Sequence, residues 1–576
     1  MDHLFLPSFD TAFVTQFSIV LAALLVAIVV TFGPARLADA FDDGFRRVEV
    51  GVTWISRSGW RAVSAIMAIE IVLRVTLLPL VGVPLPFVHD EYSSILQAQM
   101  MVQGRLAWPT PELWEAFETF HVNMIPNYAS IYFPGRGAPM ALGLLLTGQP
   151  WPGVLIVMAL LAGATVWALR GWMGPRLAFG GGLLVVLSYG TASYWINSYW
   201  GGAFTALGGA LLLGAYPRLM RAPQWRDGLM MGVGLLVLTI SRPFEGFFLA
   251  LPVAAACLFW FVRRLRQGHF TKAARLAVPA AVFLGLAGLI MISANLAATG
   301  EAGQTAYGIN RDTYALAPAL LSAPPLDGPK RGDARFRAFY EWEASSYAWR
   351  DSLASHLRSI VNKTEVIWSF YVTALFTIPF MFGIWRMVRR RRFAMPLLSG
   401  IAVTLAFYNE SWDFSHYVSP AFIVAILAIM LGFEAMVQAG PLFRRMAWTL
   451  AVAALPALLV PLGHGLLVPP QPQAQTATPC CQFVVRSYRA DLLERLQGMP
   501  GRHLVLVSYA PGATPHDELV WNEPDIDAAT IIWARDLGPE MNKKLLARYP
   551  DRTVWHVTGH LRNADGGVVL TRSDYP

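Results

Sequence analysis

Two adjacent carboxylates, Asp90 and Glu91, follow directly after a long apolar stretch of the chain. A carboxylate at the lip of a membrane helix is costly in lipid and therefore faces water, a partner group or a ligand. Such a group can accept a proton from a hydroxyl or bind a divalent cation. Because His-Asp-Glu recurs at 516–518, the tripeptide alone is unspecific, and its surroundings must carry the interpretation.

The segment that follows the acid pair combines an amphipathic stretch at 95–106 with a cluster of ring-bearing side chains. These are Trp114, Phe117, Phe120, His121, Tyr128, Tyr132 and Phe133. Aromatic rings at a membrane interface, beside carboxylates, suit a sugar ring that faces a lipid headgroup. We therefore predict that His121, Tyr128 and Tyr132 contribute to a substrate-binding site around Asp90.

Long apolar segments must position these residues. The chain has 576 residues, of which 55% are hydrophobic and only 14% charged, and its three cysteines exclude a disulfide scaffold or a cysteine-built zinc site. About 20 apolar residues cross a bilayer as a helix. Twelve runs approach that size, at 14–33, 62–84, 152–170, 177–195, 200–217, 228–241, 246–263, 275–297, 366–387, 394–409, 417–437 and 446–467. The sequence predicts a polytopic α-helical membrane protein with about 12 transmembrane helices.

The distribution of Lys and Arg predicts the orientation. The connection at 34–61 is rich in arginine, and every second connection after it is again basic, whereas the alternate ones are nearly bare apart from 298–365. Basic loops stay on the cytoplasmic side. We expect the bare loops, both termini and the acid pair to lie on the opposite side.

Three large pieces then lie outside the cytoplasm, and they divide the chain. The transmembrane domain, 1–467, carries outer loops at 85–151 and 298–365, of which the first is the predicted catalytic loop. A linker at 468–478, rich in Pro, Gln, Ala and Thr, leads into residues 479–576. There, β-rich runs at 503–509, 529–533 and 553–558 alternate with helical runs at 488–498 and 539–549, which predicts a small extramembrane α/β domain.

The first outer loop resembles that of the GT-C superfamily of integral-membrane glycosyltransferases. Asp90 and Glu91 are followed by Ala98, Met101, Gly104 and Pro109, a pattern similar to protein O-mannosyltransferases and lipid A aminoarabinose transferases. The resemblance implies a GT-C-like fold over roughly 60–440. It also implies inverting transfer of a hexosyl or pentosyl group from a polyprenyl-phosphate donor to an envelope glycan, lipid or protein. Asp90 matches the catalytic acid, and Glu91 matches its neighbour.

Other positions follow the family more weakly. Arg242 stands where relatives hold the donor phosphate, and its alternative is an ion pair with Glu245. His416-Tyr417 resembles a basic-aromatic pair that opens a late span. Many relatives carry a further acid where this chain has Asn197, which could form a hydrogen bond to a sugar but could not bind a metal as an acid would. Whether Asp90 and Glu91 bind a divalent cation is therefore left open, and no other cofactor is implied. Arg136 replaces a base that relatives carry near the end of the loop.

Two other functions compete with the transferase hypothesis. A lipid-linked sugar flippase or small-solute transporter needs polar groups along several spans, but Glu70 and Arg74 are nearly the only charges at mid-span. A non-enzymatic envelope-assembly subunit would act through its tail. Under the transferase hypothesis, the partners are the lipid-linked donor, the acceptor and the bilayer, with no nucleic acid. The Ala, Gly and Arg bias favours a bacterial inner membrane with a periplasmic site.

Overall fold

The computed structural model describes residues 11–328, 330–467, 478–482, 488–509, 513, 515–559 and 569–572. Each of the twelve apolar segments contains a helix. These helices are α1 (Thr11–Phe32), α3 (Gly59–Thr76), α7 (Trp151–Leu169), α8 (Pro175–Ser188), α9 (Ala203–Arg221), α10 (Trp225–Ser241), α11 (Pro243–Arg266), α12 (Phe270–Thr299), α16 (Thr373–Arg389), α17 (Ala394–Asn409), α18 (Phe422–Gln438) and α19 (Pro441–Leu467).

Among the described residues, eight helical segments are long and apolar enough to cross a membrane, so the chain is a multi-pass membrane protein. The other four predicted spans, α3, α8, α10 and α17, are shorter or more charged. Helix α3 ends at Thr76, and the short helix α4 (Leu78–Val81) follows it, with Pro79, which lacks an amide hydrogen, in its first turn. Helix α8 ends at Ser188, before the turns that lead to α9, so the prediction of 177–195 was too long at its end.

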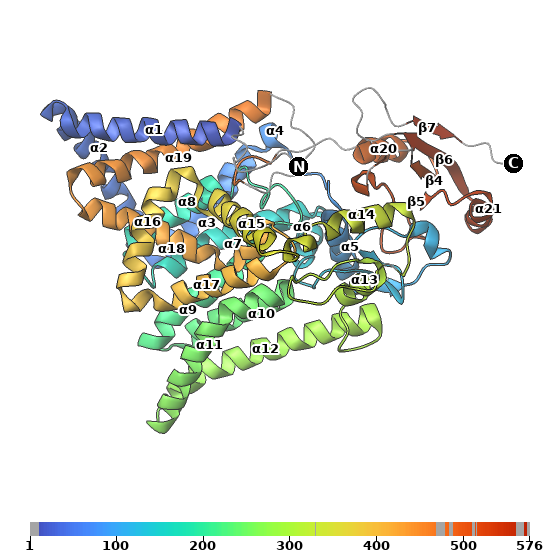
Figure 1. Ribbon diagram of the computed structural model, residues 1–576, viewed down its shortest axis with the longest axis horizontal. Coiled ribbons are helices and arrows are strands. Elements are labelled where there is room, and N and C mark those ends of the chain that lie inside the picture. The colour runs from blue at the N-terminus through green and yellow to red at the C-terminus, as the bar shows by residue number, and fades with distance from the viewer. Residues whose placement is uncertain are drawn as a thin grey trace.

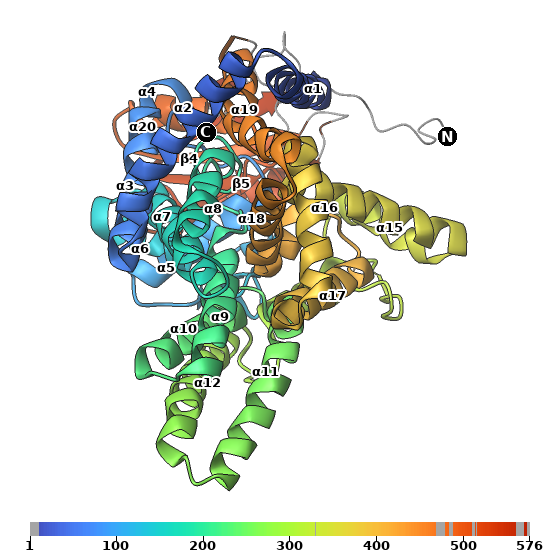
Figure 2. The ribbon, with the colours of Figure 1, turned by 90° about the vertical axis from the view of Figure 1, so that its left-hand side faces the viewer.

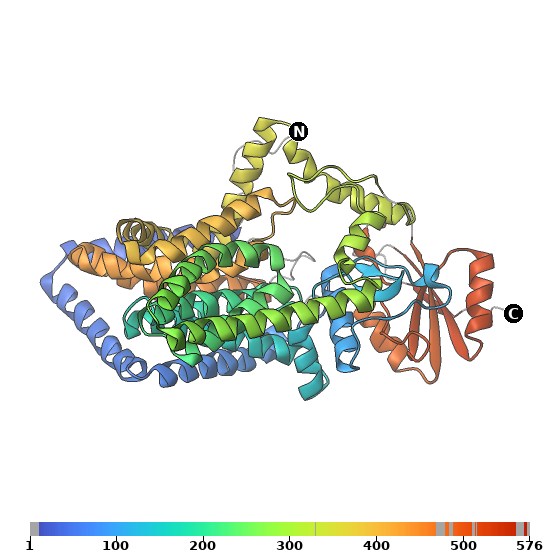
Figure 3. The same ribbon diagram turned by 90° about the horizontal axis from the view of Figure 1, so that it is seen from below.

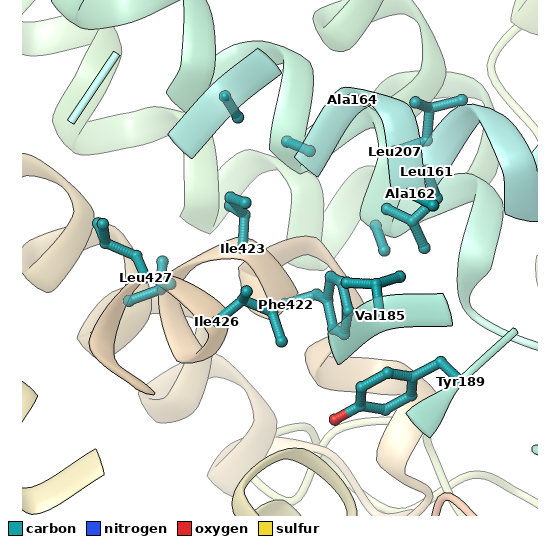
Figure 4. Close-up of a cluster of buried hydrophobic side chains, with 14 of the residues drawn as sticks. Leu161, Ala162, Ala164, Val185, Tyr189, Leu207, Phe422, Ile423, Ile426 and Leu427 are labelled. Atoms are coloured by element: carbon teal, nitrogen blue, oxygen red, sulfur yellow. The ribbon is translucent and has the colours of Figure 1, made fainter. Parts of the chain in front are cut away.

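The core of the membrane region is built by α7, α8, α9 and α18, in each of which at least half of the residues are buried (Figure 4). Small residues allow neighbouring helices to approach closely there. At Gly383 of α16 and Gly432 of α18, a Cβ atom would overlap the backbone of the opposite helix. By contrast, α11 and α12 form a long hairpin that projects from this core (Figure 2).

Helices α2 and α15 are among those that lie outside the twelve predicted spans. The first, α2 (Ala35–Ser56), lies in the connection at 34–61, and it runs along the outside of the bundle (Figure 3). Asp42 of α2 forms ion pairs with Arg444 at 3.0 Å and Arg445 at 3.2 Å, which fasten this helix to α19. The second, α15 (Leu353–Ile367), continues through a π-helical turn (Trp368–Val372) into α16.

The outer loops are folded. The first contains α5 (His89–Val102), the 3₁₀ turn Trp114–Phe117, β1 (Trp108–Pro109), β2 (Val122–Asn123), β3 (Asn127–Ser130) and α6 (Ala138–Thr147). Its three short strands form an antiparallel sheet in the order β1-β3-β2. The second contains α13 (Ala306–Tyr314) and α14 (Ala334–Ala344), and a later 3₁₀ helix, Ser415–Ala421, precedes α18.

The C-terminal region is a separate α/β layer at one end of the molecule (Figure 1). Its helices are α20 (Tyr488–Gln497) and α21 (Pro539–Arg548), and its strands are β4 (Arg502–Tyr509), β5 (Ile531–Arg535), β6 (Arg552–Gly559) and β7 (Val569–Arg572). The sheet order is β5-β4-β6-β7, with the first three strands parallel and β7 antiparallel. The predicted linker lies outside the described residues except for its last position, 478.

This region packs against both outer loops. Arg535 at the end of β5 is almost fully buried and forms ion pairs with Glu518 at 2.7 Å and with Asp333 of the second loop at 2.5 Å. Its Nε donates to the backbone oxygen of Glu118 in the first loop at 2.7 Å. One side chain therefore joins the C-terminal region to both outer loops.

Candidate functional site

A cavity of about 140 Å³ lies where the two outer loops meet the ends of the membrane helices. Its lining residues are Val88, His89, Asp90, His121, Ile131, Tyr132, Arg136, Trp200, Arg242, Tyr307, Asn310, Arg311, Phe339, Trp342, Glu343, Trp412, Phe414, His416 and Tyr417. A water molecule needs roughly 10–15 Å³ of such space, so the cavity holds on the order of ten waters. That capacity is comparable to the heavy atoms of one sugar ring.

Asp90 lies in the first turn of α5, where the partial positive charge of the helix favours an anion. Its Oδ1 accepts a hydrogen bond from the Tyr132 hydroxyl at 2.5 Å and faces Arg136 Nη2 at 3.4 Å. Its Oδ2 lies 3.6 Å from His121 Nδ1. Burial works to raise the pKa of Asp90, but His121, Arg136 and the Tyr132 hydrogen bond together hold it below its usual range. The group is an ionised carboxylate and a weak base.

His121 and Tyr132 complete this polar cluster. The Tyr132 oxygen lies 3.1 Å from His121 Nδ1, and the guanidinium of Arg136 stacks over the Tyr132 ring at 4.5 Å. The backbone oxygen of His121 accepts from Ser93 Oγ at 2.6 Å. Burial lowers the pKa of His121, although Asp90 favours the charged form, so the imidazole is neutral at pH 7.

A further arginine, Arg242, and the rings of His416 and Tyr417 also line the cavity. Arg242, between α10 and α11, forms the ion pair with Glu245 at 2.5 Å and also stacks over Tyr417 at 4.4 Å. Glu245 and Tyr417 outweigh burial and raise the pKa of Arg242 above its ordinary value, so it stays charged. His416 stacks on Tyr417, and its Nδ1 lies 3.2 Å from the hydroxyl of Tyr194.

A backbone contact brings two of the arginines together. The amide of Gly135 donates to the carbonyl of Ile240 at 2.8 Å, which joins the loop before α6 to the end of α10. Arg136 and Arg242 follow closely on each side of this contact. Both also line a second, smaller cavity whose other walls include apolar residues of α6, α7 and α9, among them Val154 and Phe204.

Three predicted site residues lie outside the lining of the main cavity. Glu91 accepts hydrogen bonds from the backbone amides of Phe87, Val88 and Tyr199, so it caps α5 and braces the neighbouring loop. Tyr128 donates to the carbonyl of Asn522 in the C-terminal region at 3.1 Å. Asn197 accepts from Arg74 Nη2 at 2.6 Å inside the bundle. Each side chain is already engaged in holding the structure together.

The second outer loop also lines the cavity, and none of its lining residues was predicted from the sequence. Arg311 of α13 pairs with Glu343 of α14 at 2.6 Å, and both line the cavity. Tyr307, Asn310 and Trp342 come from the same two helices. The only signal in the sequence was the abundance of aromatic and charged residues in 298–365, which a folded loop needs in any case.

The two neighbouring acids do not converge on a common point. Asp90 faces the cavity, whereas Glu91 faces backbone amides. Within the part of the chain that the structure describes, no three His, Cys, Asp or Glu side chains gather closely enough to hold a metal ion. Asp90 is the one carboxylate of the predicted pair that reaches the cavity.

No protein-family model and no curated protein matches this chain. Among solved structures, the oligosaccharyltransferase AglB from Archaeoglobus fulgidus, in complex with an inhibitory peptide and a dolichol-phosphate, gives a TM-score of 0.45 at 12% identity. This match covers 87% of this chain and 69% of that one. ArnT from Cupriavidus metallidurans bound to undecaprenyl phosphate gives a TM-score of 0.43 at 13% identity, and the match covers 87% of this chain and 93% of that one. ArnT in the apo state gives 0.45 at the same identity and coverage.

Proposed function

We propose that the protein is a membrane glycosyltransferase that moves a sugar from a polyprenyl-phosphate donor to an acceptor, with inversion at the anomeric carbon. The observation that carries this proposal is the cavity itself. It places an ionised carboxylate, Asp90, in the same space as the cations Arg136 and Arg242, between aromatic walls. A sugar bound there would have polar groups for its hydroxyls and rings for its apolar faces.

The chemistry of the leaving group explains why two arginines would line the cavity. Transfer breaks the bond between the anomeric carbon and the phosphate oxygen and leaves negative charge on the phosphate. Fixed cations beside apolar walls stabilise such charge more strongly than water does. Arg136 and Arg242, which line both cavities, would hold the phosphate, and the apolar residues of the smaller cavity would contact the first part of the lipid chain.

The membrane setting fits a donor that stays in the bilayer. The cavity lies at the ends of apolar helices, so a lipid-linked sugar could reach it without leaving the membrane. The arginine-rich connections, which favour the cytoplasmic side, support a periplasmic position for this end at a bacterial inner membrane. The acceptor, an envelope glycan, lipid or protein, would then arrive from the periplasm past the second outer loop.

The test uses purified protein in lipid nanodiscs with a panel of radiolabelled polyprenyl-phosphate sugars, both hexoses and pentoses, and an envelope extract as the source of acceptor. Wild type should transfer label from at least one donor to the extract. Failure with every donor, from protein shown to be folded, would refute the proposal.

The same samples separate the two competing functions. A flippase would move an intact labelled donor across the membrane of a proteoliposome without cleaving it. An assembly subunit would neither cleave nor move the donor, and its activity in cells would depend on the C-terminal region and not on Asp90.

A further inference from the structure

His121 has an unusual backbone for a residue with a large side chain. Its φ is +57°, in the left-handed region that glycine adopts readily and other residues, among which Asn, Asp and His are enriched, adopt uncommonly. Hydrogen bonds from Ser93 Oγ at 2.6 Å and the Ile131 amide at 3.3 Å fix its carbonyl oxygen. Strained residues that the surroundings hold in place are concentrated at functional sites. His121 is held in this conformation, and its side chain lines the cavity.

Three rings hold the imidazole edge-on, which fixes its orientation. His89 and Phe339 each lie 5.6 Å from its centroid, and Tyr132 lies at 5.9 Å. The Nδ1 side of the ring points at Tyr132 and Asp90, at 3.1 and 3.6 Å, so the Nε2 side points away from them.

The hydrogen bonds determine which nitrogen carries the proton. The Tyr132 hydroxyl has one hydrogen, which is directed at Asp90 Oδ1 at 2.5 Å. Its oxygen can therefore only accept from His121 Nδ1 at 3.1 Å. Nδ1 carries the hydrogen, and Nε2 has a free lone pair. No hydrogen bond reaches Nε2 from the described residues.

We propose that His121 Nε2 is the atom that takes the proton from the acceptor hydroxyl, while Asp90 remains ionised and stabilises the imidazolium that forms. This assignment rests on the proposed function. The acceptor O–H bond breaks, its proton passes to Nε2, and its oxygen bonds to the anomeric carbon. The bond from that carbon to the phosphate oxygen breaks, and its electron pair leaves with the phosphate.

The charges support His121 over Asp90 as the base. Asp90 is already engaged by Tyr132 and Arg136 and has a lowered pKa, whereas the imidazole is neutral and starts with a free lone pair. A base works best when its pKa lies near the working pH. The groups that face His121 from the elements around it are Asp90, Tyr132, Arg136, Arg311, Glu343 and His89.

The experiment compares two nucleophiles with His121→Asn, which tolerates the left-handed backbone and keeps a donor at the Nδ1 position. Transfer to the hydroxyl acceptor should fall by about 10²–10⁴-fold. Azide carries no proton and needs no base. Because the substitution removes only the general base, formation of the glycosyl azide should stay within about threefold of wild type. His269→Asn, at an exposed position in the α11–α12 hairpin, should behave as wild type in both reactions.

Two outcomes would overturn the assignment while leaving the proposed function standing. One is hydroxyl transfer by His121→Asn within about tenfold of wild type, which is less than a general base supplies. The other is an equal loss with both nucleophiles, which would indicate a structural role. If wild type cleaves no polyprenyl-phosphate sugar with either nucleophile, the proposed function fails, and this assignment fails with it.

Discussion

Replacing Arg535 by Met tests how firmly the C-terminal region holds the outer loops that line the cavity. The substitution keeps a long apolar side chain but removes ion pairs with Glu518 and Asp333 and the bond to the Glu118 carbonyl. Breaking a buried ion pair by removing one partner costs about 3–5 kcal/mol, because the remaining charge is left uncompensated.

The cost of Arg535→Met should lie at the lower end of the range of about 3–5 kcal/mol, because both partners keep other compensation. Glu518 is fully buried, but it still accepts from the amides of Leu519 at 3.0 Å and Val520 at 2.9 Å, and Arg335 lies 3.7 Å away. Asp333 is 41% exposed and is compensated by water. We therefore expect a loss of about 3 kcal/mol, which shifts the equilibrium for opening by about a hundredfold.

Amide hydrogen exchange of the protein in nanodiscs measures that opening in β5 and α14. Arg548→Met is the matched control, because Arg548 also joins the C-terminal region to the first loop, through Glu112. It is 39% exposed and its partner is 72% exposed, so its loss should cost less than about 1 kcal/mol. Equal effects of the two variants on exchange would refute the reasoning.

Three further outcomes concern the cavity. Arg242→Gln should raise the KM for the donor by about tenfold or more, the value of one charge-assisted hydrogen bond, and Arg242→Lys should recover part of it; unchanged KM values would exclude a phosphate contact. Tyr132→Phe removes the hydroxyl that joins Asp90 to His121 and should lower kcat by about ten- to hundredfold, with little change in donor KM. Because burial lowers the pKa of His121 from its ordinary value of 6.5, kcat should stay level above neutral pH and fall in acid as the imidazole becomes protonated; a rate that rose in acid would contradict this sign.

The membrane helices could be predicted because apolar length is a property of the chain itself. Helix α2 was missed because its mixture of charged and apolar residues resembles a connection. Its ion pairs with α19 and α8 join residues far apart in sequence and could not be read from the segment itself. The positions of β4, β5 and β6 in the C-terminal region were visible as β-rich runs, whereas β7 was not predicted. The parallel order of β4, β5 and β6 depends on contacts far apart in sequence.

The placement of side chains was harder to predict than the segments that carry them. Neighbouring residues on a helix point about 100° apart, and on α5 Asp90 faces the cavity whereas Glu91 turns to the backbone amides of Phe87, Val88 and Tyr199. Asn197 was predicted to bind substrate because relatives carry an acid at that position, but its side chain accepts a hydrogen bond from Arg74 of a distant helix. Arg311 and Glu343 carried no signal because their pairing depends on how α13 and α14 fold together.

The most direct test of the central claim is a single-turnover measurement with Asp90→Asn and wild type, each preloaded with the polyprenyl-phosphate sugar that wild type accepts. Asn is isosteric and still accepts from Tyr132, but it carries no charge to stabilise an imidazolium 3.6 Å away. At an effective dielectric constant of about 20, that interaction is worth about 4–5 kcal/mol, or roughly a thousandfold in rate. We predict donor binding close to that of wild type with transfer reduced by that factor. Transfer by Asp90→Asn at the wild-type rate would contradict the account.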